Sequence, residues 1–127
     1  MKITPVLLVE KIEPSLDFWV EKIGFEKTAS VPEGDALAFV LLQTAGADLM
    51  LPPRASAAHD VPAMKEHMNG QGVGLFLEVA DFEDLLRRVE GTEVLMPERT
   101  TFYGMREIVV KEPGGFAVCF ASPAAKG

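Results

Sequence analysis

The chain carries one order of secondary-structure signals twice. An apolar, β-rich run is followed by an amphipathic helix pattern and then by three further strand signals, and the whole order then starts again. Self-similarity at a fixed offset indicates a fold built from two copies of one supersecondary unit. The matching positions are 70, 70 and 69 residues apart: Val9 and Val79, Leu16 and Leu86, and Gly46 and Gly115.

Each repeat is therefore predicted to fold as strand, helix, strand, strand and strand. The sequence predicts strands over 3–9, 26–31, 37–44 and 47–51 in the first repeat, and over 73–79, 93–96, 105–111 and 116–121 in the second. The fold class is α+β. With 127 residues we expect one domain, 1–127, consisting of the first repeat (3–51), a linker (52–72) and the second repeat (73–122).

The first helix is predicted within "EPSLDFWVEKIGF". Pro14 suits its first turn and Gly24 its C-terminal cap. Its expected buried stripe, at helical spacing, is Leu16, Trp19, Val20 and Ile23. Trp19 is expected in the core, whereas Phe18 lies off the stripe and is a candidate for an interface.

The second helix is predicted within "DFEDLLRRVEG". Asp81 is its expected N-cap and Gly91 follows its end. Its apolar face holds Phe82, Leu85, Leu86 and Val89. The linker is rich in Pro, Ala and Gly, and a short helix over 62–68 is expected inside it.

Strand alternation assigns the faces of the two predicted sheets. Leu7, Val9, Leu75 and Leu77 should meet the helices, as should alternate residues of the last strands, such as Phe120. The opposite faces carry small or mixed residues, among them Leu8, Ala121 and Cys119. Either the two curved mixed sheets enclose a cavity, or the small side chains let the repeats pack closely.

Composition excludes several classes of partner. The formal net charge of −7 argues against nucleic acid, because an acidic surface repels phosphates. No segment has the roughly 20 apolar residues of a membrane span, and the N-terminal segment is unlike a secretory signal. A single cysteine excludes an internal disulfide and fits a reducing compartment. We therefore expect a cytoplasmic protein that binds neither nucleic acid nor membranes.

The paired units, the segment "EPSLDFWVEKIGF" and the segment "YGMREIVVKEPGG" resemble the vicinal oxygen chelate superfamily, which includes glyoxalase I, extradiol dioxygenases and bleomycin-resistance proteins. The resemblance covers roughly 3–122 and implies a glyoxalase-like fold of two βαβββ units around a cavity. Its sharpest motif is the turn Glu112-Pro113-Gly114-Gly115 before the last strand. Relatives of this kind commonly form homodimers, so a homodimer is expected.

In metal-dependent members, the first and last strands of each unit supply the metal ligands. The resemblance places those positions on Thr4, Met50, Gly74 and Cys119. Hard divalent cations take carboxylate, imidazole and carbonyl ligands, which this set lacks. The two histidines, His59 and His67, lie in the linker without metal-ligand spacing. We expect no metal and no cofactor.

The resemblance then implies the metal-free branch, whose members bind drugs and confer resistance by sequestration. Its aromatic residue before the "GMR" stretch corresponds to Tyr103. The expected ligand-binding residues are Tyr103, Glu107, Phe76, Glu78, Met50, Met105 and Cys119, with Arg106 on the other face. Aromatic faces stack on planar or cationic ligands, and the two glutamates would favour a cation.

Two other function classes stay open at this point. One is a lyase- or isomerase-type enzyme that uses a cavity glutamate as general base, or Cys119 as nucleophile, in place of a metal. The other is a protein-binding module without a ligand. Each of the glutamates and Tyr103 also has a purely structural reading, as a rim residue or as a cover for the core.

Overall fold

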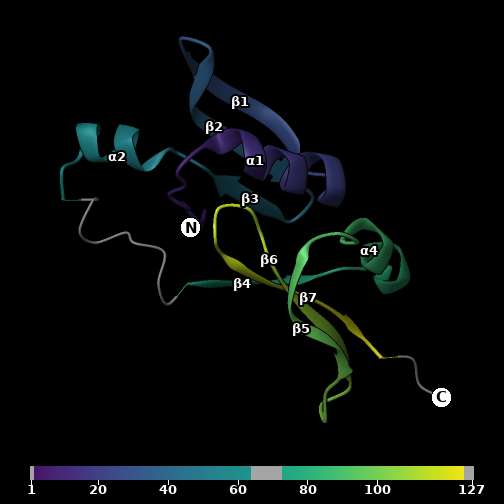
Figure 1. The fold of residues 1–127 in the computed structure, drawn as a ribbon. Coiled ribbons are helices and arrows are strands. Elements are labelled where there is room, and N and C mark those ends of the chain that lie inside the picture. The colour runs from purple at the N-terminus through teal and green to yellow at the C-terminus, as the bar shows by residue number, and fades with distance from the viewer. Residues whose placement is uncertain (1, 64–72, 125–127) are drawn as a thin grey trace. The chain divides into compact units, whose positions relative to one another are not determined.

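The computed structural model of the chain describes residues 2–63 and 73–124 (Figure 1). Contacts divide the chain into two compact units, Met1–Gln71 and Gly72–Gly127, called here the N-terminal and C-terminal units. Each unit has its own sheet. Within the described ranges, no helix is long and apolar enough to span a membrane.

The N-terminal unit contains an antiparallel sheet in the order β1-β2-β3. Its strands are β1 (Glu26–Glu33), β2 (Ala36–Thr44) and β3 (Ala47–Met50). The expected first strand is reduced to two parallel bridges, Val6 to Met50 and Val9 to Pro53. Proline has no N–H group to donate, so the prolines at 5, 52 and 53 shorten this ladder.

The first helix begins as α1 (Ile12–Leu16) and continues as the π-helix η1 (Asp17–Ile23), ending at Gly24 with φ 103°. Because a π-helix places neighbours at i and i+5, the buried face departs from the predicted stripe. Phe18 is fully buried beside Trp19, with ring centroids 5.0 Å apart, so its assignment to an interface was wrong. Trp19 is confirmed in the core, whereas the other three stripe residues are half-buried: Leu16, Val20 and Ile23.

A second helix lies inside the predicted linker, at a different place from the one expected. It is α2 (Arg54–Asp60), an alanine-rich segment that begins directly after Pro53. The helix expected over 62–68 is wrong at its start, because residues 62 and 63 form a turn. The rest of that segment, with His67, lies outside the described residues.

The C-terminal unit repeats the same strand order with one complete strand more. Its four-stranded sheet runs β4-β7-β6-β5, with β4 parallel to β7 and the other neighbours antiparallel. The strands are β4 (Gly74–Glu78), β5 (Glu93–Thr100), β6 (Met105–Lys111) and β7 (Ala117–Pro123). In both units the opening segment pairs in parallel with the last strand, which confirms two βαβββ repeats in an α+β fold.

One face of the C-terminal sheet is covered by α4 (Phe82–Arg88), which packs on β7. Asp81 caps this helix as predicted, its carboxylate accepting a 3.0 Å hydrogen bond from the Asp84 N–H. On the covered face, the Arg106 guanidinium lies 4.7 Å from the centre of the Phe82 ring and pairs with Glu83 at 2.7 Å. The fully buried residues of this face are Val110, Val118 and Phe120.

The predicted alternation of faces holds along most strands. Leu7, Val9 and Phe120 are buried as expected, and Phe76 and Cys119 point away from the covered face. Three deviations occur among the residues predicted to face away from the helices: Leu8, Ala121 and Glu107 are also buried. Phe76 and Cys119 thus lie on the face of the C-terminal sheet opposite α4.

Candidate functional site

The C-terminal sheet presents a face opposite α4, which we call the open sheet face. Strand register orders its side chains in rows across the strands. Phe76, Cys119 and Val109 form one row. The next row reads Glu78, Ala121, Glu107 and Arg99. The register thus brings five of the predicted site residues together on this face: Phe76, Glu78, Met105, Glu107 and Cys119.

Glu107 is the centre of a hydrogen-bonded group. Its side chain is only 3% exposed. Arg99 donates to its Oε1 from Nη2 at 3.1 Å and from Nε at 3.3 Å. Tyr103 donates its phenolic hydrogen to Oε2 at 2.8 Å. A buried carboxylate needs such partners, since desolvation without them is costly.

Tyr103 reaches Glu107 from the turn between β5 and β6. Thr101 holds this turn closed: its N–H donates to the Met105 carbonyl at 2.7 Å, and its hydroxyl accepts from the Met105 N–H at 3.0 Å. Gly104, with φ 83°, takes a left-handed conformation that side chains disfavour. The turn therefore folds the Tyr103 ring back toward the sheet while leaving the residue 56% exposed.

Two pKa shifts follow from this arrangement. The hydrogen bond to the Glu107 carboxylate raises the pKa of the Tyr103 phenol above its usual 10.0, with desolvation adding to it. Burial raises the pKa of the Cys119 thiol, and the charge of Glu107 raises it further, whereas Arg99 lowers it. Cys119 is thus held as a thiol, which is a poor nucleophile.

The pairing of Glu107 with Arg99 bears on the expected ligand. Two glutamates suggested a cation-binding surface, but the charge of Glu107 is balanced by Arg99. Only Glu78, which is exposed on β4, has no charged partner among the described residues. One of the two glutamates on which the expected cationic ligand rested is therefore already neutralised within the protein.

Arg99 is the member of this group that sequence reasoning missed. The predicted strand ended at Met96, whereas β5 continues through Pro97 to Thr100 and places Arg99 opposite Glu107. The hairpin turn at Tyr103 and Gly104 was the available signal. Counting outward from that turn pairs an arginine with a glutamate across the two strands.

The four metal-ligand positions of the metal-dependent relatives do not fit a metal. Gly74 begins β4 and has no side chain, and a Cβ atom there would lie 3.9 Å from the Ala117 carbonyl oxygen. Cys119 is a thiol of raised pKa, and Thr4 and Met50 are half-buried residues of the N-terminal unit. Within the described ranges, no three His, Cys, Asp or Glu side chains form a group suited to a metal ion.

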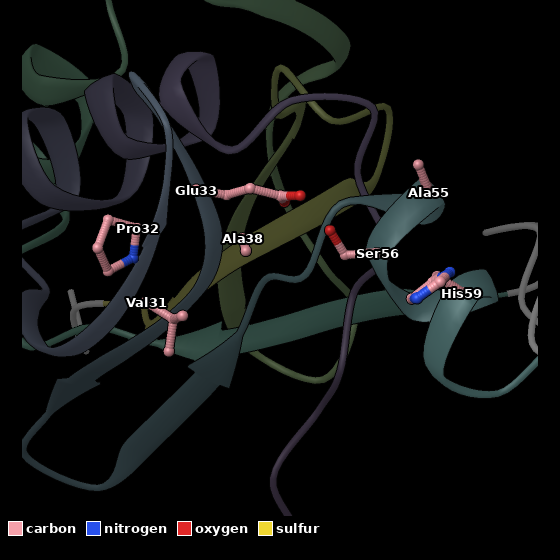
Figure 2. Close-up of a pocket in the computed structure, with 7 residues that line it drawn as sticks. All are labelled: Val31, Pro32, Glu33, Ala38, Ala55, Ser56 and His59. Carbon is pink, nitrogen blue, oxygen red and sulfur yellow. The ribbon is translucent and has the colours of Figure 1, made fainter.

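The N-terminal unit has a hollow of its own, between β1, β2 and α2. Its volume is about 450 Å³ and it is open to solvent. Figure 2 shows Glu33 on the strand side of the hollow and Ser56 and His59 on α2. Its lining residues are Val31, Pro32, Glu33, Ala38, Ala55, Ser56 and His59. Sequence analysis did not foresee this hollow, because α2 was expected elsewhere.

The chain is similar to a known protein family over nearly its whole length. A family model described as the Glyoxalase/Bleomycin resistance protein/Dioxygenase superfamily matches residues 3–120. The chain belongs to this superfamily. No curated protein sequence matches the chain significantly.

Solved structures with the superfamily's fold are similar to the chain over nearly its whole length. A glyoxalase/bleomycin resistance protein/dioxygenase from Nocardioides has a TM-score of 0.72 and 23% identity, covering 100% of this chain and 86% of its own. TioX from Micromonospora sp. ML1 has a TM-score of 0.76 and 17% identity, covering 97% and 98%. TnmS3, an antibiotic binding protein from Streptomyces sp. CB03234, has a TM-score of 0.69 and 23% identity, covering 98% and 99%. At these identities the likeness concerns the fold.

Proposed function

We propose that this chain is a metal-independent small-molecule-binding protein and that its ligand lies on the open sheet face. The observation that carries the proposal is the pair of exposed rings, Phe76 and Tyr103, on a face whose buried polar centre is already satisfied. Exposed aromatic rings beside a few fixed polar groups are typical of surfaces that bind planar ligands. Met105 and Cys119 supply further apolar contact in this proposal, and Met50 of the N-terminal unit stays a predicted contact.

Antibiotic sequestration is the biological role that we propose for this binding. The family description includes bleomycin resistance proteins, and TnmS3 is described as an antibiotic binding protein. A sequestering protein needs affinity without chemistry. An apolar face with one neutralised ion pair meets that need, because it offers contact area and orientation without a reactive group.

A metal-free enzyme is the weaker alternative. A general base must be able to take up a proton from the substrate, but both oxygens of Glu107 already accept hydrogen bonds from Arg99 and Tyr103. A nucleophilic cysteine needs a lowered pKa, whereas burial raises that of Cys119. Glu78 is exposed on β4 and lies at the edge of the sheet, away from the hydrogen-bonded group around Glu107.

We also propose that the protein is cytoplasmic and forms a homodimer. A single thiol is compatible with the cytoplasm, where cysteines stay reduced. A homodimer is proposed from the resemblance stated above. Size-exclusion chromatography with light scattering would measure it, and a monomer at micromolar concentration would overturn it.

The binding proposal is tested by a thermal-shift screen of antibiotics that carry planar aromatic rings, in the presence of a chelator. A bound ligand raises the melting temperature by mass action. Phe76→Ala should abolish the shift, whereas Val31→Ala should keep it. The two side chains are matched in exposure, at 55% and 52%, but Val31 lines the hollow of the N-terminal unit.

The outcomes separate the candidate functions. Loss of the shift in Val31→Ala alone would move the site to the N-terminal hollow. No shift with any compound, together with a protein partner captured through the open sheet face, would favour the protein-binding module.

A further inference from the structure

Arg99 is the one cation in the row that crosses the middle of the open sheet face. Its guanidinium has five N–H donors. Two of them, one on Nε and one on Nη2, are directed to Glu107 Oε1. Among the described residues, its remaining donors have no partner, and the side chain is 57% exposed. Arg99 thus keeps a second, solvent-facing set of donors.

The contact with Glu107 also fixes where those donors point. A free arginine on a surface loses side-chain entropy when it binds a ligand. Here the paired bonds to a buried carboxylate hold the guanidinium plane in place before any ligand arrives. Preorganisation of this kind lowers the cost of binding.

The surrounding charges do not cancel this effect. Glu78 lies in the same row but three strands away, which is about 14 Å at the usual strand spacing. That distance exceeds the Debye length of about 8 Å at physiological salt. Lys111 is paired with Glu93 at 3.8 Å, near the other end of the strands.

We propose that Arg99 recognises the acidic group of the ligand, so that the ligand class is a planar aromatic anion: a carboxylate, a sulfonate or an ionised phenol. This inference rests on the proposed function and names its substrate class. The ring system stacks on Tyr103, which shares the Glu107 carboxylate with Arg99, and the acid accepts hydrogen bonds from the outer edge of the guanidinium. Glu107 acts as a positioning residue in this arrangement, since it orients Arg99 without touching the ligand.

Two fluorescent probes with the same ring system test this class. Anilinonaphthalenesulfonate carries a sulfonate, and N-phenylnaphthylamine is the same molecule without it. The wild-type protein should bind the sulfonate about tenfold more tightly, as expected for charge-assisted hydrogen bonds. Raising the salt concentration should weaken binding of the sulfonate and leave the neutral probe unchanged.

The decisive variant removes both charges of the ion pair, so that neither charge is left without its partner. Arg99→Gln alone strands the Glu107 carboxylate, so the decisive variant is the double substitution Arg99→Gln with Glu107→Gln. This variant leaves the net charge unchanged. It should lose the preference for the sulfonate and still bind the neutral probe. Arg87→Gln is the matched control, because Arg87 is 65% exposed on α4 in the same unit.

The outcomes distinguish failure of the anion inference from failure of small-molecule binding itself. Equal binding of both probes by the wild-type protein, or an unchanged sulfonate preference in the double variant, overturns the anion inference and leaves small-molecule binding standing. Failure of the wild-type protein to bind either probe overturns both. Probe affinity that falls as protein concentration rises would assign the face to a second copy of the chain, which also overturns the inference.

Discussion

Tyr103 donates a 2.8 Å hydrogen bond from a hairpin turn to Glu107, a carboxylate buried in the neighbouring strand. The bond connects the exposed turn residue Tyr103 to Glu107, which is buried in the open sheet face. Because Tyr103 is the only tyrosine in the chain, its ionisation can be followed without interference.

The pKa of the Tyr103 phenol should lie above the usual 10.0, because the phenol donates a hydrogen bond to the Glu107 carboxylate and its ionisation would place two negative charges side by side. Ultraviolet titration of tyrosinate measures this, and Glu107→Gln should move the midpoint back down. A pKa raised in the folded state stabilises the protein below pH 10. That contribution is lost as pH rises through the folded pKa. A wild-type midpoint at or below 10 would disprove the hydrogen bond.

Cys119 should react slowly with iodoacetamide near neutral pH. Burial and the Glu107 charge both raise the pKa of its thiol, so little thiolate is present. Glu107→Gln should speed alkylation and Arg99→Gln should slow it further, since the two charges act in opposite directions. Mass spectrometry gives the rate at a single site, because the chain has one cysteine. Alkylation as fast as that of a small-molecule thiol would contradict the described environment.

Phe18→Ala should lower the free energy of unfolding by about 3–5 kcal/mol, the usual cost of removing a buried phenylalanine ring. The side chain is 1% exposed and packs edge-on against Trp19. Chemical denaturation followed by circular dichroism measures the change. Phe102→Ala is the control, because Phe102 is fully exposed and its loss should cost less than about 0.5 kcal/mol. A stable Phe18→Ala protein with weakened self-association would restore the interface assignment.

Purified protein should contain well below one metal ion per chain. The reason is the donor set, since Thr4, Met50, Gly74 and Cys119 offer no carboxylate or imidazole. Inductively coupled plasma mass spectrometry after dialysis provides the measurement. Gly74→His would add one of the ligands that metal-dependent relatives use and is not expected to create a site by itself. Stoichiometric zinc, nickel, iron or manganese would refute this reading.

The fold could be predicted because it depends on local signals that repeat. Alternation in the strands, the Asp81 cap and the offset between Val9 and Val79 all report the same two-unit plan. The register of the C-terminal sheet then follows from the turn at Gly104 and the one before Phe116. These signals act over a few residues, so a single sequence contains them.

The predictions that were wrong concern the geometry of the first helix and the length of β5, which short sequence patterns do not determine. The buried face of the first helix was predicted at 3.6 residues per turn, the spacing of an α-helix. Because η1 is a π-helix with a wider turn, Phe18 falls on the buried face instead. The predicted strand stopped at Met96, whereas β5 passes through Pro97 on the edge of the sheet and carries Arg99 with it. The partner that neutralises Glu107 therefore stayed unseen.

The most direct test of the account is an amide NMR titration of metal-stripped protein with anilinonaphthalenesulfonate in the presence of a chelator. The account predicts saturable shifts that cluster at Phe76, Arg99, Tyr103 and Cys119, without any added metal. Shifts that appear only after a divalent metal is added in excess of the chelator, or that cluster at Val31 and His59, would contradict it.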